Sequence, residues 1–175
     1  SDSNDGSEAS PYATIQKALD QNKALGGSYE VIVKSGWYFF TDSYTITNNV
    51  RITGKGKVEI FNSGTSDGYI FFTAGTNIIE FNNLTMIGGT AGAISGSNTY
   101  GGSGNLGKVL NIINCTFEDN RGYVGAIATY SNTTILQSTF INNNAYGTSS
   151  YFRGLISARD NSLTVNFCNF IGNTL

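Results

Sequence analysis

The sequence predicts an all-β fold: a parallel β-helix, in which coils of short strands stack on one another, with one N-terminal capping α-helix. Three observations lead to this prediction. A short segment of alternating apolar and polar residues recurs, its copies are 23 to 34 residues apart, and Gly, Asn and Ser are abundant between them. The alternation is typical of a strand, and the recurrence is typical of a repeat architecture. None of the joins carries a tight hairpin signal, so the strands are expected to pair between coils.

The chain is expected to begin with a disordered leader or linker at residues 1–9, which are polar and acidic. A capping helix is predicted over residues 10–27, because Ser10 can cap it, Pro11 suits its first position and a Gly-Gly pair ends it. Placed before the first strand, this helix would cover the open end of the stack. The helix and the coils after it are predicted to form a single domain, residues 10–175.

The coils are predicted to occupy residues 29–175. Short strands are expected early in this region over the following segments: 31–33, 37–40, 44–46, 50–52, 58–60, 69–72 and 78–81. Residues 34–36 are interpreted as a turn, and the Gly-Lys-Gly segment 54–56 as a break between two strands.

The recurring segment is clearest as Asn-Cys-Thr-Phe, with Phe117 as its anchor. Its matching segments are 83–86, 114–117, 137–140 and 167–170, and a fainter copy is 49–52. Stacking of the copies predicts one apolar column of anchors: Ile52, Met86, Phe117, Phe140 and Phe170. Three residues after the four stronger anchors stand Gly89, Asn120, Asn143 and Asn173.

Asparagine opens three of the copies, as Asn49, Asn83 and Asn114. These residues are predicted to form a corner, because asparagine tolerates the left-handed conformation and stacked amides can bond to each other. Glycine marks a second apolar strand after two anchors, at 92–94 and 125–127, with a looser copy at 154–156.

The uneven spacing of the anchors indicates loops of different length, at residues 97–107 and 142–153. The competing fold is a β-sandwich or antiparallel barrel. That fold would need strands at intervals of about 8–12 residues with tight turns, and it would not explain the aligned columns.

The composition excludes some classes of partner. Only 13% of the residues are charged and the net charge is −2, so no basic stripe is expected to attract a nucleic acid or an anionic membrane. No apolar run is long enough for a transmembrane helix, so no direct membrane insertion is expected. Cys115 and Cys168 fall in one column two coils apart, about 9.6 Å, which is too far for a disulfide. Two free, buried thiols are expected.

The columns resemble a known family pattern. Phe-x-x-Asn stands at 117–120, 140–143 and 170–173, Gly-Ala-Ile stands at 92–94 and 125–127, and the opening segments are 12–19 and 29–38. They are similar to the repeats of chlamydial polymorphic outer-membrane proteins and of adhesin-like surface proteins of methanogenic archaea. Both groups belong to the pectin-lyase-like superfamily, so the resemblance implies a right-handed parallel β-helix.

The same superfamily contains polysaccharide lyases and hydrolases, which place carboxylates in neighbouring coils on one outer face. Here Glu118 aligns with isoleucines, Asp119 aligns with Gly88, Asn142 and Gly172, and the chain has no histidine. No catalytic residue, cofactor site or metal site is therefore predicted. Glu118 and Asp119 are interpreted as a solvated corner, although Glu118 is an unexplained departure from its column.

The most interesting candidate for binding is the loop 142–153. It carries Tyr146, Tyr151, Phe152 and Arg153 among Asn, Gly and Ser, a composition typical of binding loops. Tyrosine can stack on a sugar ring and bond through its hydroxyl. The alternative is that these aromatic residues cover an open seam of the coil.

The resulting hypothesis is an extracellular, cell-surface, adhesin-like binding and display domain. It is expected to act as a monomer and to contact a partner cell, protein or glycan. One alternative is a polysaccharide lyase or hydrolase, or a fragment of one that lacks its catalytic coils. Another is a purely structural envelope component. The natural protein is expected to continue past residue 175, because the last strand is followed by no cap.

Overall fold

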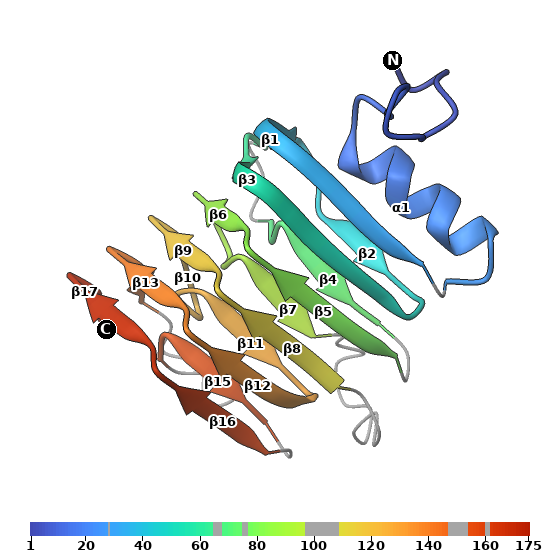
Figure 1. The fold of residues 1–175 in the computed structure, drawn as a ribbon. Coiled ribbons are helices and arrows are strands. Elements are labelled where there is room, and N and C mark those ends of the chain that lie inside the picture. Colours follow the sequence, from blue (N-terminus) through green and yellow to red (C-terminus); the bar gives the residue numbers. More distant parts are fainter. Residues whose placement is uncertain (28, 65–67, 75–76, 97–108, 147–153, 160–161) are drawn as a thin grey trace.

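The computed structural model describes residues 1–27, 29–64, 68–74, 77–96, 109–146, 154–159 and 162–175. The chain forms a parallel β-solenoid of about 4 turns, and the helix α1 (Ile15–Ala24) caps its first coil. The N-terminus and α1 lie at one end of the stack and the C-terminus lies at the other (Figure 1). The predicted fold class is confirmed.

The strands of the described residues form three parallel sheets. In chain order they are β1 (Glu30–Phe40), β2 (Tyr44–Ile46), β3 (Val50–Asn62), β4 (Phe71–Thr73), β5 (Ile78–Asn82), β6 (Thr85–Ile87), β7 (Ile94–Gly96), β8 (Val109–Ile113), β9 (Thr116–Glu118), β10 (Arg121–Gly122), β11 (Ile127–Thr129), β12 (Asn132–Leu136), β13 (Thr139–Ile141), β14 (Asn144–Ala145), β15 (Ile156–Ala158), β16 (Leu163–Asn166) and β17 (Asn169–Ile171). The largest sheet has the order β16-β12-β8-β5-β3-β6-β9-β13-β17, with β1 on β3. The second sheet is β15-β11-β7-β4-β2, and β10 pairs with β14.

The capping helix begins later than the sequence indicates. Thr14 is its N-cap and accepts a hydrogen bond from the amide of Lys17, so the prediction that Ser10 caps the helix and Pro11 begins it is wrong. The reason lies in residues 1–9, for which a disordered leader is predicted. They run through turns and bends, and Asp2 accepts hydrogen bonds from the amides of Ala13 and Thr14. These bonds hold residues 10–13 outside the helix.

The helix packs its apolar face on the first coil. Ile15 and Leu19 are buried in the core of the stack, one helical turn apart. The hydroxyl of Tyr44 on β2 donates a hydrogen bond to Asp20 (2.7 Å), which ties the outer part of the helix to the same coil. The helix therefore shields apolar side chains that would otherwise face water at this end.

The first two long strands are continuous, in contrast to the prediction. Residues 34–36 form a bulge within β1, where the register on β3 shifts between Lys34 and Gly36, and not a turn. Residues 54–56 lie inside β3 and do not separate two strands. A Cβ at Gly54 would lie 2.1 Å from the carbonyl oxygen of Asn83. Glycine is thus required here by the close approach of the next coil.

In each coil after the one that contains β3, a sharp corner divides what β3 spans as one strand. The corner residues Asn83, Asn114, Gln137 and Phe167 have φ of 55°, 51°, 51° and 56°. The corners predicted at Asn83 and Asn114 are confirmed, and Asn114 Nδ2 donates to Asn83 Oδ1 (3.1 Å). Asn49 lies between β2 and β3, which belong to different sheets, but it does not have the positive φ of these corner residues. Its side chain accepts from the amide of Ile78 at the start of a strand.

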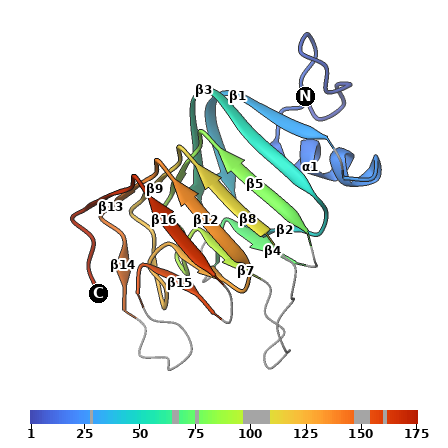
Figure 2. The same cartoon turned by 60° about the horizontal axis from the view of Figure 1, so that its bottom comes forward.

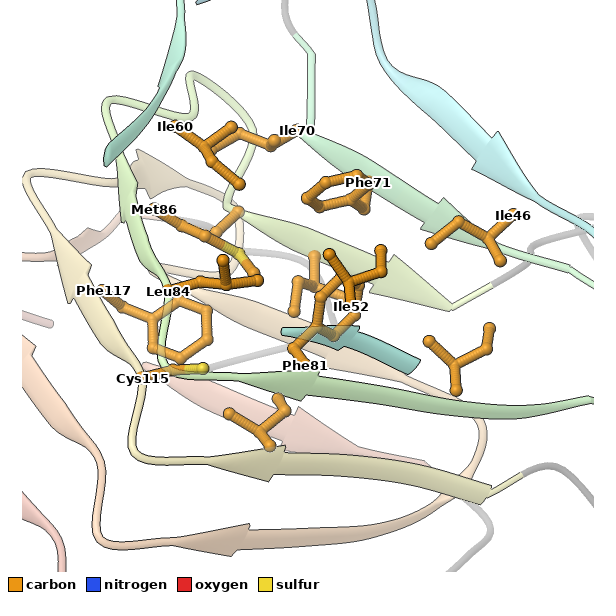
Figure 3. Packing of buried hydrophobic residues seen from close by; sticks show 14 of the residues in the cluster. Ile46, Ile52, Ile60, Ile70, Phe71, Phe81, Leu84, Met86, Cys115 and Phe117 are labelled. Carbon is orange, nitrogen blue, oxygen red and sulfur yellow. The ribbon is translucent and has the colours of Figure 1, made fainter. Parts of the chain in front are cut away.

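The anchor column is confirmed for all copies except the faintest. Met86 pairs with Ile60 on β3, and Ile52 pairs with Phe81 in a different column, so the assignment of Ile52 is wrong. β3 covers two faces of the coil, so it contains two stretches of alternating apolar and polar residues. The stretch with Ile60 belongs to the anchor column, whereas the copy at 49–52 lies in the other stretch. The corrected column is Ile60, Met86, Phe117, Phe140 and Phe170. Figure 3 shows part of the core that these columns form.

The other predicted columns are also present. Ile94, Ile127 and Ile156 pair across β7, β11 and β15, so the glycine-marked strand recurs as expected. Figure 2 shows the ladder of β5, β8, β12 and β16 along one side of the stack. Together these ladders form a core that runs through the coils, in which Phe81, Phe117 and Phe140 are fully buried.

A ladder of buried asparagines closes the corner after the anchor column. Asn120 and Asn143 are 0% exposed. Asn143 Oδ1 accepts from both nitrogens of Asn120, and Asn173 Oδ1 accepts from both nitrogens of Asn143. Each side-chain amide also donates to a main-chain carbonyl of the neighbouring coil. These bonds satisfy polar groups that the corner would otherwise bury without partners.

Candidate binding surface

The predicted contact residues are only partly placed by the structure. Tyr146 follows β14 directly and is 55% exposed. Tyr151, Phe152 and Arg153 lie outside the described residues. The alternative that these aromatic residues cover an open seam of the coil stays a prediction.

Tyr146 has a neighbour that the sequence analysis missed. The pairing of Gly122 with Ala145 brings Tyr123 alongside Tyr146 in the next coil. The two ring centroids are 6.1 Å apart with an angle of 44° between the planes, and Tyr123 is 59% exposed. A signal was available: 23 residues separate Tyr123 from Tyr146, the same interval that separates Phe117 from Phe140. Equal intervals place both pairs in columns.

The strands β10 and β14 hold the two tyrosines on a fixed backbone. The amide of Tyr146 donates to the carbonyl of Gly122 (3.0 Å), and the amide of Arg121 donates to the carbonyl of Gly89 (2.8 Å). A Cβ at Gly122 would lie 2.5 Å from the carbonyl carbon of Ala91, so only glycine fits at this contact. The tyrosine backbone is therefore tied to the coils before and after it.

Arg121 and Asn144 pair with each other on the same strands and are exposed beside the tyrosines. We call Arg121, Tyr123, Asn144 and Tyr146 the paired-tyrosine surface. It combines two aromatic faces with a guanidinium, an amide and two hydroxyls. Such a set can stack on an apolar ring or side chain while bonding to polar groups around it.

The acidic residues near this surface form no carboxylate pair. Glu118 pairs with Ile87 and Ile141, as the alignment predicts. Asp119 has a φ of 53°, and Asn142 and Gly172, its counterparts in later coils, have φ of 51° and 62°. Asp119 thus occupies a left-handed corner, a conformation that Asp tolerates better than most residues. The interpretation of Asp119 as a corner residue agrees with this backbone.

A charged column on another face was missed by the sequence analysis. Arg51 lies between Glu30 and Glu80 on adjacent strands, and its Nε is 2.7 Å from a carboxylate oxygen of Glu80. Glu30 accepts a hydrogen bond from the hydroxyl of Thr53. With Tyr29, these side chains line a shallow, open depression. Predicting this column needed the register of β1 on β3 and of β3 on β5, which no sequence pattern indicates.

The two cysteines are free, as predicted, but only Cys115 is buried, whereas Cys168 is half-buried. Burial raises the pKa of the Cys115 thiol to about 12, so this thiol is protonated at neutral pH and is a poor nucleophile. The described residues contain no group of three or more His, Cys, Asp or Glu side chains that could hold a metal ion. Among them there is also no helix with the length and apolar character that a membrane crossing needs.

Comparisons with known proteins do not extend these observations. No protein-family model, no curated protein and no solved structure matches the chain.

Proposed function

We propose that this protein is a cell-surface, adhesin-like domain that works by display and binding and not by catalysis. The observation that carries the proposal is the pair of exposed tyrosines, Tyr123 and Tyr146, on a backbone fixed by the coils. Its partner is a glycan or protein on a host or neighbouring cell. The domain acts outside the cell and as a monomer.

Two features support a binding role for the paired-tyrosine surface. Tyrosine gives a large contact area with few rotatable bonds, so ordering it on binding loses little entropy. Arg121 and Asn144 add donors next to the rings, and the strand ladder positions all four side chains before a partner arrives. The resemblance of the repeats to adhesin-like surface proteins points in the same direction.

Alanine variants of the two tyrosines test this role. We expect Tyr123→Ala and Tyr146→Ala each to weaken binding of the labelled protein to partner cells about tenfold, the size typical of an aromatic hot spot. Because the rings contact each other, the double variant should lose less than the product of the single losses. The measurement is a cell-binding titration by flow cytometry, with and without enzymatic removal of surface glycans.

Tyr29→Ala is the matched control, since Tyr29 is also an exposed tyrosine (58%) but lies near the start of β1. This variant should bind as the wild type does. Equal binding by all five proteins would contradict a role for the paired-tyrosine surface. Loss of binding after glycan removal would identify a glycan partner, and retention would identify a protein.

A second candidate function is hydrolysis or lysis of a polysaccharide. The observation that favours it is the column in which Glu30 and Glu80 flank Arg51. Carboxylates two strand spacings apart are about 9.6 Å from each other, close to the upper limit for an inverting pair. Incubation with polygalacturonate and xylan, followed by assays for reducing and unsaturated ends, tests it. Activity that disappears in Glu80→Gln and persists in Glu118→Gln would establish catalysis and overturn our first proposal.

A further inference from the structure

The solenoid has a second aromatic surface, on the outer side of the strands that carry the anchor column. Trp37 and Phe39 point outward from β1, and Phe61 continues from Phe39 onto β3. The outward column then runs through Ile87 of β6. We call Trp37, Phe39, Phe61 and Ile87 the outer aromatic face. It is distinct from the paired-tyrosine surface, which belongs to the sheet of β10 and β14.

This face leaves large aromatic side chains in water. Trp37 is 73% exposed and Phe39 is 60% exposed, although both are paired with residues of β3. The rings of Phe39 and Phe61 are stacked, with centroids 5.3 Å apart and an angle of 19°. Contiguous exposed apolar surface of this kind is typical of a site that a partner covers.

A polar column runs parallel to the aromatic one. It begins at Glu59, which pairs with Trp37, and continues as the hydroxyls of Thr85, Thr116 and Thr139. Both columns follow the strand ladder, so their side chains repeat about every 4.8 Å on a single flat face. The face is thus amphiphilic along its length, with apolar groups beside hydrogen-bonding groups.

Charge on this face is largely neutralised. Trp37 Nε1 donates to one oxygen of Glu59 (2.6 Å), and Lys57 Nζ is 2.8 Å from the other oxygen. In the column that runs through Phe61 and Ile87, Glu118 occupies the position that isoleucine occupies in the neighbouring coils, at Ile87 and Ile141. The Lys57–Glu59 pair therefore gives the face no excess of positive charge. The charged group that is added further along is the carboxylate of Glu118. An anionic ligand would be repelled by Glu118.

We propose that the outer aromatic face binds a neutral, linear polysaccharide that lies along the solenoid. Sugar rings have apolar C–H faces, which suit Trp37, Phe39 and Phe61, and hydroxyl rims, which suit the threonine column. A nucleic acid or a uronan is disfavoured because Lys57 beside Trp37 is already paired with Glu59, and Glu118 adds a negative charge further along. This inference rests on the proposed binding function and names the ligand class, but different residues carry it.

The test is a pull-down of the whole chain with two insoluble neutral glycans, amorphous cellulose and chitin, and with a polygalacturonate gel as the anionic comparison. We expect binding to at least one neutral glycan and about tenfold weaker binding by Trp37→Ala and by Phe39→Ala. Trp37→Phe keeps a ring but loses the indole donor, so it should stay within about threefold of the wild type. Because Trp37 and Phe39 are exposed, their loss leaves the core intact.

Some results would overturn this inference. They are a failure to bind either neutral glycan, tighter binding to polygalacturonate, or equal binding by Trp37→Ala and the wild type. A dimer in sedimentation equilibrium that Trp37→Ala dissociates would also overturn it, because a second copy would then cover the face. The variant with both Tyr123 and Tyr146 changed to alanine should keep its glycan binding. Loss of cell adhesion in that variant alone would therefore separate the two proposals.

Discussion

Replacing Asn143 with alanine is expected to lower the free energy of unfolding by about 3–5 kcal/mol. Asn143 is fully buried, and its side chain joins three coils. Its Oδ1 accepts from the amide of Asn120 (3.0 Å) and from Asn120 Nδ2 (2.9 Å). Its Nδ2 donates to the carbonyl of Phe117 (2.9 Å) and to Asn173 Oδ1 (3.0 Å). Alanine would remove these partners from the amide of Asn120 and the carbonyl of Phe117, and each buried group left unpaired costs about 1–3 kcal/mol. Asn120 Nδ2 would keep its bond to Met86, and Asn173 Oδ1 would keep its bond from the backbone amide of residue 143.

Urea unfolding followed by circular dichroism measures this effect. Asn144→Ala is the matched control, because Asn144 is the next residue along the chain and its side chain is exposed. The control should change stability by no more than about 0.5 kcal/mol. Equal stability of the two variants would show that the asparagine ladder contributes little to the fold.

An aspartate at the same position separates hydrogen bonding from volume. Asn143→Asp keeps the shape but places a carboxylate oxygen against the carbonyl of Phe117 and the Oδ1 of Asn173. Burial and these acceptors should raise the pKa of the new carboxyl in the folded state. Its protonated form is then favoured by folding, so stability should be highest below the unfolded pKa of about 4 and should fall as the pH rises toward 7. The wild type should not show this loss.

The asparagine ladder also shows what the sequence could reveal. Asn120, Asn143 and Asn173 follow their anchors at one fixed distance, so their common column could be predicted without a structure. Their hydrogen bonds could not, because a side chain at a corner can point inward or outward. The left-handed backbone at Asn83 and Asn114 was predictable, since asparagine adopts it readily. At Phe167 the same conformation occurs in a residue that carries no such preference.

The first two coils are where prediction failed, and the cause is the length of β1 and β3. From Thr85 onward each strand lies on one face of the coil, so the alternation of apolar and polar residues assigns each strand to one column. In β3 the alternation covers two faces, and Ile52 and Ile60 are equally good candidates for the anchor column. The bulge at residues 34–36 adds a second uncertainty, because a shift of one residue exchanges the inner and outer side chains.

The same limits apply to the prediction of the candidate surfaces. Tyr146 was recognised by composition, and Tyr123 could have been found from the repeat interval. The outward orientation of Trp37 and Phe39 depends on the register beyond the bulge, so the sequence shows only an aromatic strand. The column of Glu30, Arg51 and Glu80 lies before the bulge, but it depends on how β1, β3 and β5 are aligned, which the sequence does not show. Sequence reasoning was therefore most successful where copies repeat and least successful where the repeat begins.

Truncation of Phe117 to alanine is the second change with a large expected effect, about 3–5 kcal/mol of unfolding free energy. Phe117 is 0% exposed and pairs with Met86 in the coil before it. Its ring is stacked on Phe140, with centroids 5.0 Å apart and an angle of 8°. Alanine would remove the apolar contacts and leave a cavity that the rigid strand spacing cannot close.

Two further variants separate the causes of this loss. Phe39→Ala removes the same atoms from a ring that is 60% exposed and stacked on one neighbour, so it should lower stability by less than about 1.5 kcal/mol. Phe117→Leu fills most of the space but removes the ring stacking, and it should also cost less than about 1.5 kcal/mol. A similar loss in Phe117→Ala and Phe39→Ala would contradict the assignment of Phe117 to a packed column.

The shape of the unfolding curve tests how far the coils depend on one another. In a solenoid each coil contacts only its neighbours, so a defect at Phe117 weakens the interfaces with Met86 and Phe140 and leaves distant coils unchanged. If these interfaces hold the stack together, Phe117→Ala should unfold in two steps, with a smaller denaturant dependence for each step than for the wild type. The helix-capped first coils would be the part that remains folded longer. A single transition with an unchanged denaturant dependence would instead show that the stack unfolds as one cooperative unit.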